Sequence, residues 1–168
     1  MNIFEKVSFE QFLKDCRNSS EITIAQASEE DIRWAYDNIK LPTNATKCSA
    51  GLDFYYPFKD ILHVGKIPKV FPTGVRWIGD DNMVLLIVPR SSLGFKYQLK
   101  LLNTVGVIDA DYCCSDNEGH IQLGLVSETD CYISTNDRVV QGITVNFCKL
   151  DNASDAPTRN GGFGSTSR

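Results

Sequence analysis

The sequence predicts an all-β domain preceded by a short helical extension. From Thr46 onward, short stretches rich in Val, Ile, Leu and aromatic residues alternate with Gly, Pro, Asn and Asp, which is typical of strands and turns. Before that point, apolar residues recur at helical spacing instead. Many short strands with little helix between them favour a closed or double-sheet body. A chain of 168 residues is naturally one domain and can bury a proper core.

Two helices are expected in the extension. The first spans residues 5–16 and carries its large apolar side chains on one side. The second spans residues 28–40, where Ser28 can cap the start and three acidic residues fill the first turn, which suits the helix dipole. Pro42 stops it, because the residue before a proline avoids the helical region. This helix carries no chemistry of its own and is expected to pack across the outside of the domain or against a partner.

The remainder divides into a strand region and a polar end. We expect residues 1–45 to form the helical extension, 46–150 the β domain and 151–168 a mobile segment, because that last stretch is poor in large apolar residues. The expected strands are 49–55, 74–78, 83–88, 100–104, 121–126 and 138–148.

Composition excludes several classes of function. The net charge of −4 argues against a protein that holds a nucleic-acid polymer, since that task needs a dense basic face. A single nucleotide remains possible, because a few well-placed cations suffice for it. The N-terminal stretch has no long apolar run, so neither a signal peptide nor a membrane span is expected.

Cysteine usage points to a reducing compartment. The chain has six cysteines without a C-x-x-C pair, and only two histidines, so we expect no zinc site built from these residues. A chain of this length does not need disulfides for stability. We therefore expect a cytoplasmic protein with free thiols.

The stretch NTVGVIDADY, from Asn103 to Tyr112, is the most informative part of the sequence. It turns on Gly106 and then places Asp109 and Asp111 beside an aromatic residue. A buried strand that ends in an acid is costly unless that acid is paired or used. The alternative is an ordinary strand end with a turn-forming aspartate.

Five segments together carry a family resemblance. In order and rough spacing they resemble the five motifs of the homotrimeric dUTPases, over about residues 46–168. The specific parts are GVIDADY and GGFGST, whereas the others would be weak alone. The segments are AGLDF (50–54), PRSSLG (89–94), NTVGVIDADY (103–112), NDRVVQ (136–141) and RNGGFGST (159–166).

The resemblance implies a jelly-roll-like subunit in a homotrimer with shared active sites. It implies hydrolysis of dUTP to dUMP and pyrophosphate by in-line attack of water at the α-phosphorus, with Mg²⁺, which keeps uracil out of DNA and supplies dUMP. Asp109 resembles the carboxylate that activates the water, and Gln141 the polar residue near that water. Asp53 resembles the acid near the metal, acting through water. Asp111 more closely resembles a neighbour that holds the turn.

The remaining motif positions would bind the substrate. Tyr112 resembles the ring that leaves no room for a 2′-hydroxyl, and Asn103 the amide that reads uracil. The main chain beside them would complete the contacts with the base, through Gly106, Val107, Ile108 and Gln122.

Phosphate contacts would come from two further segments. Arg90, Ser91 and Ser92 can donate to phosphate oxygens, although Arg90 could instead, or as well, pair with Asp53. The last segment resembles the family's closing lid, with Arg159 on the γ-phosphate and Phe163 over the uracil. Its other contacts would come from Gly164, Ser165 and Thr166.

Two features depart from the family pattern. Arg159 is one residue closer to Phe163 than in the common R-G-x-G-G-F lid, which weakens the case for the arginine clamp. The segment CCSDNE intervenes between Tyr112 and Gly119, where the family hairpin is usually tight. We read it as a longer hairpin tip, and whether it touches substrate stays open.

Two alternatives use the same fold. A dCTP deaminase would need a glutamate in the strand after the turn, and the matching position is Gly124. A non-catalytic regulator that senses dUTP is the other, with the helical extension as the place where a partner could dock.

Overall fold

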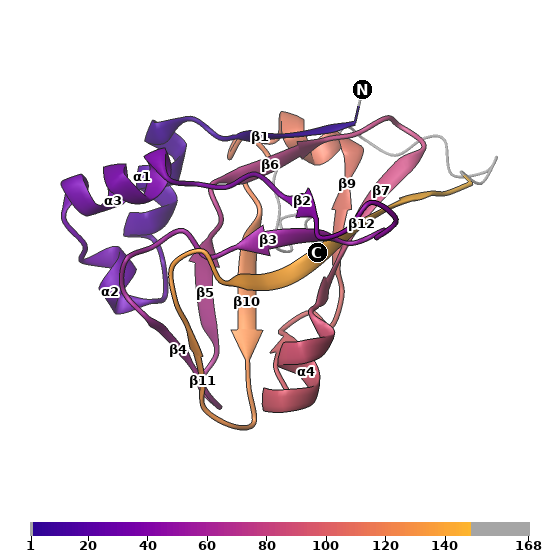
Figure 1. Cartoon of the computed structure of the whole chain (residues 1–168). Coiled ribbons are helices and arrows are strands. Elements are labelled where there is room, and N and C mark those ends of the chain that lie inside the picture. The colour runs from indigo at the N-terminus through magenta and orange to yellow at the C-terminus, as the bar shows by residue number, and fades with distance from the viewer. Residues whose placement is uncertain (1, 149–168) are drawn as a thin grey trace, which may run out of the picture.

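The computed structural model describes residues 2–148, which form antiparallel sheets with three helices gathered on one side (Figure 1). The predicted all-β class with an N-terminal helical extension is confirmed. The strands are β1 (Ile3–Lys6), β2 (Thr43–Asn44), β3 (Leu52–Tyr55), β4 (Leu62–Val64), β5 (Lys69–Pro72), β6 (Val75–Ile78), β7 (Met83–Pro89), β8 (Lys100–Leu101), β9 (Gly106–Asp109), β10 (Gln122–Val126), β11 (Cys131–Ile133) and β12 (Arg138–Asn146).

The largest sheet has five strands in the order β2-β3-β12-β7-β9. Strand β12 pairs with β7 over their full overlap, from Val140 opposite Pro89 to Asn146 opposite Met83. Strand β9 lies on the other side of β7, with Gly106 opposite Ile87. The middle of β12 needs a small residue, because a Cβ on Gly142 would lie 2.9 Å from both Leu85 and Phe54 side chains.

Three smaller antiparallel sheets complete the body. Strand β10 lies between β5 and β8, β11 pairs with β4, and β1 pairs with β6. In the β1–β6 ladder, Ile3 lies opposite Ile78 and Lys6 opposite Val75. The first strand of the extension is therefore hydrogen-bonded to the β domain.

The extension contains α1 (Phe9–Arg17), α2 (Ile22–Ala25) and α3 (Glu29–Asp37). Helix α1 begins later than predicted, because residues 3–6 are extended and the Ser8 side chain accepts from the Gln11 amide to cap the helix. Helix α3 and its cap at Ser28, which accepts from the Asp31 amide, are confirmed.

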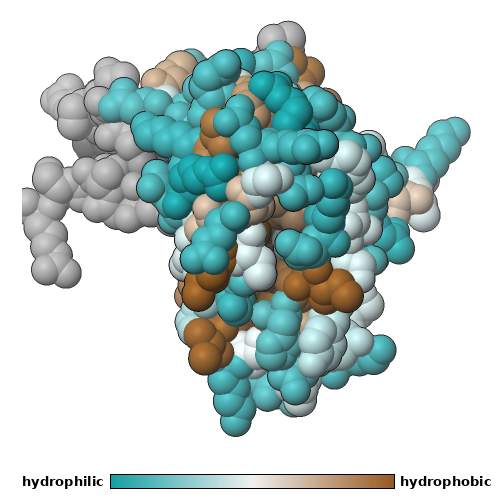
Figure 2. All heavy atoms as spheres, turned by 90° about the vertical axis from the view of Figure 1, so that its left-hand side faces the viewer, coloured by the Kyte–Doolittle hydropathy of each residue, from teal (hydrophilic) through white to brown (hydrophobic). Residues whose placement is uncertain are grey.

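One hydrophobic core joins the helices to the strands. Phe12 of α1 and Ile32 of α3 are fully buried, in the same cluster as Tyr56 and Phe71 of the β body. The ring of Phe12 stacks on that of Phe58 at 5.8 Å and 13°. The outward side of the helices is mostly hydrophilic, with only separate hydrophobic patches (Figure 2). None of the helices within residues 2–148 is long and apolar enough to cross a membrane.

Every predicted strand overlaps an observed one, but several elements were missed. The missed strands are β1, β2, β4, β5 and β11, and helix α2 was missed as well. Each is four residues long or shorter, a length at which the local pattern of apolar and polar residues is ambiguous. Helix α4 (Ser91–Tyr97) was missed because Arg90 makes no capping side-chain bond and Gly94 lies inside the helix.

We expect Phe12→Ala to lower the free energy of unfolding by about 3–5 kcal/mol, because it removes a fully buried ring and leaves a cavity. Urea denaturation followed by fluorescence, at one protein concentration, measures the change. The control is Lys14→Ala, an exposed position on the same helix. A loss no larger than in that control would show that α1 does not share the core's stability.

Candidate functional site

A cavity of about 380 Å³ lies beside β9 and β10. It brings together six of the residues predicted to contact the base and sugar, which come from the central motif and from the start of β10. They are Asn103, Gly106, Val107, Ile108, Tyr112 and Gln122. Sequence reasoning missed the apolar part of the wall, which had no signal beyond strand-like composition. That part consists of Val70, Ile87, Leu101, Leu102, Ile121 and Leu123.

The cavity depends on the close approach of β9 to β7. A Cβ on Gly106 would lie 3.1 Å from Cβ of Ile87, closer than ordinary van der Waals contact, so Ile87 would have to shift. Across the cavity, a Cβ on Gly124 would lie 2.8 Å from the Leu102 side chain. Within residues 2–148 the cavity wall contains no glutamate, so the proton-shuttling group that a dCTP deaminase would need is missing there.

Tyr112 enters the cavity from a short 3₁₀ helix, η1 (Ala110–Cys114). Its side chain is buried, and its hydroxyl donates to the carbonyl of His120 at 3.1 Å. The amide of Asn117 donates to the same hydroxyl at 2.8 Å. The ring is therefore held at its far end by the segment that follows η1.

The thiols after Tyr112 do not line the cavity. Sγ of Cys113 and Sγ of Cys114 lie 3.8 Å apart as free thiols. Burial raises the pKa of Cys113, and the neighbouring Cys114 acts in the same direction. Cys113 is thus a weak nucleophile near neutral pH.

Polar side chains also gather around Asp53 on β3. The side chain of Asp53 is almost completely buried. Its Oδ1 lies 3.1 Å from Nε of Arg90 and accepts from the Gln141 amide at 3.2 Å. Its Oδ2 accepts from Arg138 at 3.3 Å. The pairing of Arg90 with Asp53, left open by the sequence, is present. Arg138 had no role in the sequence reading, although it lies inside the NDRVVQ segment.

The elements around Asp53 explain this arrangement. Gln141 lies opposite Asp53 in the β12–β3 ladder, and a Cβ on Gly51 would lie 3.0 Å from the Gln141 amide nitrogen. Arg90 immediately follows β7, and the exposed Ser91 and Ser92 begin α4. One carboxylate therefore gathers an amide and two guanidinium groups where β7 ends and β12 begins.

Asp53 is not suited to bind a metal ion directly. Both of its oxygens already face donors, and two arginines would repel a divalent cation. Residues 2–148 contain no group of three acidic, histidine or cysteine side chains that could hold a metal ion. Any role toward Mg²⁺ is left to a bridging water.

Asp109 on β9 and the group around Asp53 on β3 lie toward opposite edges of the large sheet. Asp109 pairs with Val84, whereas Asp53 is level with Val88, because both Asp53 and Val88 pair with Gln141. This places Asp109 about 14 Å across the sheet and about 13 Å along the strands from Asp53. Asp111 is exposed in the first turn of η1. The predicted lid residues Arg159, Phe163, Gly164, Ser165 and Thr166 lie outside the described residues.

Comparison of the sequence with known families gives one assignment. The model of the dUTPase family matches residues 37–167. The deoxyuridine 5′-triphosphate nucleotidohydrolase of Lactococcus lactis is 38% identical over 133 residues, which cover 76% of this chain and 88% of that protein. The protein of the same name from Legionella pneumophila is 32% identical over 141 residues, covering 79% of this chain and 90% of that protein.

Solved structures agree with these relatives. The crystal structure of dUTPase from Streptococcus mutans matches with a TM-score of 0.59 and 33% identity, covering 68% of this chain and 91% of that chain. The dUTPase of phage phi11 of S. aureus, described with a structural Mg(II) ion, has a TM-score of 0.58 and 17% identity, covering 71% of this chain and 91% of that chain. The second match supports the fold alone.

We expect Asp53→Asn to lower the free energy of unfolding by about 1–3 kcal/mol, because it leaves two guanidinium groups without their counter-charge. Chemical denaturation at one protein concentration measures the loss. Asp81→Asn, at an exposed position, is the matched control. Equal stability of the two variants would mean that Asp53 does not hold the arginines in place.

Proposed function

The chain belongs to the dUTPase family and hydrolyses dUTP to dUMP and pyrophosphate, and we propose that it does so with Mg²⁺ in active sites shared between the subunits of a homotrimer. The observation that supports the site assignment is the cavity, which is lined by the six residues of the described part of the chain that were predicted to contact the base and sugar. The reaction keeps uracil out of DNA and supplies dUMP. A pyrophosphate-release assay over dUTP and the four standard dNTPs tests it, with turnover expected for dUTP alone.

Uracil would be read by main-chain groups and one amide. Asn103 offers both a donor and an acceptor, which suits the mixed edge of uracil. Peptide groups of Val107, Ile108 and Gln122 surround the same cavity. A site built to pair with uracil leaves the exocyclic amine of cytosine without a partner, so dCTP would be rejected.

Deoxyribose would be selected by the ring of Tyr112. The ring lines the cavity while its hydroxyl is held on the far side, so the flat face is presented to the sugar. A 2′-hydroxyl would collide with a ring fixed in this way. The selection is therefore steric and depends on how firmly the ring is held.

Phosphates would be bound by the group around Asp53. Arg90 can turn its remaining N–H donors to phosphate oxygens while Asp53 balances its charge, and Ser91 and Ser92 lie directly after it. Mg²⁺ would be held mainly by the phosphates themselves and by water, where it neutralises charge on the leaving pyrophosphate. The segment with Arg159, Phe163, Gly164, Ser165 and Thr166 would close over the bound nucleotide.

Water would be activated by Asp109, with Gln141 orienting it. A general base must come within about 3 Å of the proton that it removes. Asp109 and the Asp53 group lie across the sheet from each other within one chain. Both can reach one triphosphate if Asp109 of one subunit faces Arg90 and Gln141 of another. This is the structural argument for shared sites.

The wider setting follows from the same properties. A cytoplasmic enzyme acting on free nucleotides needs neither a nucleic-acid polymer nor a membrane as partner. The net charge of −4 suits such a role.

We expect Asp109→Asn to reduce kcat about a hundredfold or more, because the amide cannot accept the proton of the attacking water. Binding of dUTP, measured by calorimetry on the same variant, should be kept. Asp111→Asn is the control and should stay near wild type. Near-normal turnover in Asp109→Asn would move the base to another residue, Asp111 first.

Mixed trimers test the sharing of sites. Asp109→Asn and Arg90→Gln trimers should each be poorly active, and Gln keeps a donor for Asp53. When the two variants are unfolded and refolded together, random assembly would give about a quarter of the sites an intact Asp109 from one chain and an intact Arg90 from another. The mixture should regain activity on that scale.

The control for assembly is a tag on one variant, with co-purification of the other. Refolding each variant alone gives the baseline. If tagged mixed trimers form without activity above that baseline, each site uses Asp109 and Arg90 of the same chain, and the sharing is wrong.

A further inference from the structure

The segment between Tyr112 and Gln122 connects two proposed substrate contacts, and it is folded tightly against its own start. Glu118 and Gly119 both have left-handed backbone, with φ of 59° and 72°. A Cβ on Gly119 would lie 2.5 Å from Cα of Cys113 and 2.8 Å from the Tyr112 carbonyl oxygen. The segment that follows η1 therefore turns back onto it, so its position and that of Tyr112 are linked. The predicted hairpin tip is wrong, because β9 and β10 lie in different sheets and the CCSDNE segment connects those sheets.

The hydroxyl of Tyr112 makes that link through hydrogen bonds. It donates to the carbonyl of His120 and accepts from Asn117. Asn117 is in turn fixed by accepting from the Gly119 amide at 3.2 Å. A displacement of the His120 main chain would thus move the anchor of the ring that faces the sugar.

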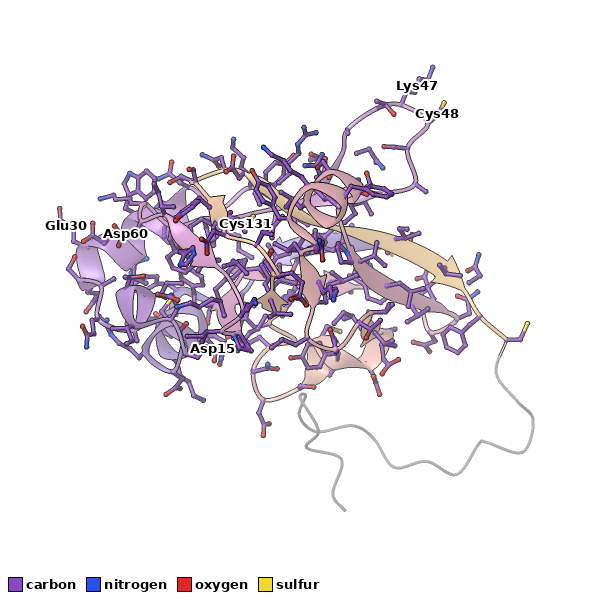
Figure 3. The ribbon with its side chains drawn as sticks, turned by 90° about the horizontal axis from the view of Figure 1, so that it is seen from below. Asp15, Glu30, Lys47, Cys48, Asp60 and Cys131 are labelled. Atoms are coloured by element: carbon purple, nitrogen blue, oxygen red, sulfur yellow. The ribbon has the colours of Figure 1, made fainter. Side chains whose placement is uncertain are left out.

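His120 itself is held by helix α1. Its imidazole is fully buried, and Nδ1 lies 2.6 Å from Oδ2 of Asp15. The amide of Gly74 donates to Nε2 at 2.8 Å, so Nε2 is an acceptor and the proton lies on Nδ1. In Figure 3, Asp15 lies between the helices and the strands, whereas Glu30 lies at the outer edge.

Asp15 is built to stay charged in this position. Gln11 donates to the same oxygen at 2.7 Å. Burial raises the pKa of Asp15, but the hydrogen bonds from His120 and Gln11 outweigh it and leave that pKa below its ordinary value. The neutral imidazole of His120 therefore donates a charge-assisted hydrogen bond from Nδ1 to the carboxylate of Asp15.

A second contact ties the same helix to the same segment. The carboxylate of Glu118 accepts from the Ser8 main-chain amide at 2.7 Å and from the Ser8 hydroxyl. Ser8 is also the cap of α1. The helix thus contacts this segment at Glu118 and at His120, the residues on either side of Gly119.

We propose that Asp15 and His120 are positioning residues for sugar selection: through them the N-terminal helix α1 fixes the ring of Tyr112 in the cavity. This rests on the proposed role of Tyr112. It gives one purpose to the helical extension, which lies before the five motifs, and to the CCSDNE segment, which departs from the family pattern. Polar contacts suit this task, because buried hydrogen-bonded groups specify a single arrangement where apolar packing would tolerate several.

The test is the ratio of kcat/KM for UTP to that for dUTP in the full-length protein. Asp15→Asn should raise this ratio about threefold to tenfold, the scale of weakening one hydrogen bond. KM for dUTP should rise more than kcat falls, because the ring contacts the sugar and not the reacting water. Asp15→Glu, which restores the charge, should recover part of the selectivity.

Two further variants separate position from stability. Tyr112→Phe keeps the ring and removes only its anchor, so it should raise the ratio to a similar extent. Combining Tyr112→Phe with Asp15→Asn should raise the ratio little further than either change alone, because both changes act on the same link. Ile32→Ala destabilises α3 at a fully buried position away from the segment that follows η1 and should leave the ratio unchanged.

The outcomes distinguish this inference from the assignment on which it rests. If Tyr112→Ala raises the ratio but Asp15→Asn and Tyr112→Phe leave it at the wild-type value, the positioning role is wrong and the sugar gate stands. An equal rise in Ile32→Ala would also overturn the positioning role, since general loosening would then explain it. If Tyr112→Ala itself has no effect, the sugar gate fails, and with it this inference.

Discussion

The antiparallel ladder of β12 with β7 and β3 is the constraint on which the rest of the structure depends. It runs from Val140 to Asn146 along β7 and places Gln141 between Asp53 and Val88. Because β9 pairs with the opposite side of β7, the same ladder determines how far Asp109 lies from the group around Asp53. Within one chain Asp109 and the group around Asp53 are thereby kept apart, which is the basis of the proposal that subunits share their sites.

The buried Asp53 shows how the ladder is used for chemistry. An aspartate with 1% exposure is unfavourable alone, and here Arg90, Arg138 and Gln141 surround it. Removing a charge from such a group leaves the others uncompensated, which makes the arrangement all-or-none. The same pairing keeps the arginines from folding down onto the surface. Charge that is already oriented loses less freedom when a phosphate binds.

Features that depend on neighbouring residues could be predicted from the sequence. Contacts between residues that are far apart in the sequence could not. Ser28 marks the start of α3, and alternating apolar residues mark the long strands, because both signals lie within a few neighbouring residues. The cavity residues that belong to the central motif could be named. The apolar wall, Arg138 beside Asp53 and the contact of Asp15 with His120 could not. The last pair is 105 residues apart, and no local pattern marks such a contact.

The two histidines clarify the choice of base. His63 is exposed and pairs with Asp130 at 2.7 Å, on the β4–β11 sheet away from the cavity. His120 lies closer, but Nε2 accepts from a main-chain amide and Nδ1 faces Asp15, so neither nitrogen can receive a proton from water without breaking a buried contact. The residue most often used as a general base is here committed to structure. In the proposed mechanism the proton of the attacking water goes to a carboxylate, and Asp109 stands directly before the 3₁₀ helix that carries Tyr112. The proposed base and the proposed sugar gate are thus adjacent on one short turn, and α1, from the other end of the chain, contacts the segment that follows this turn.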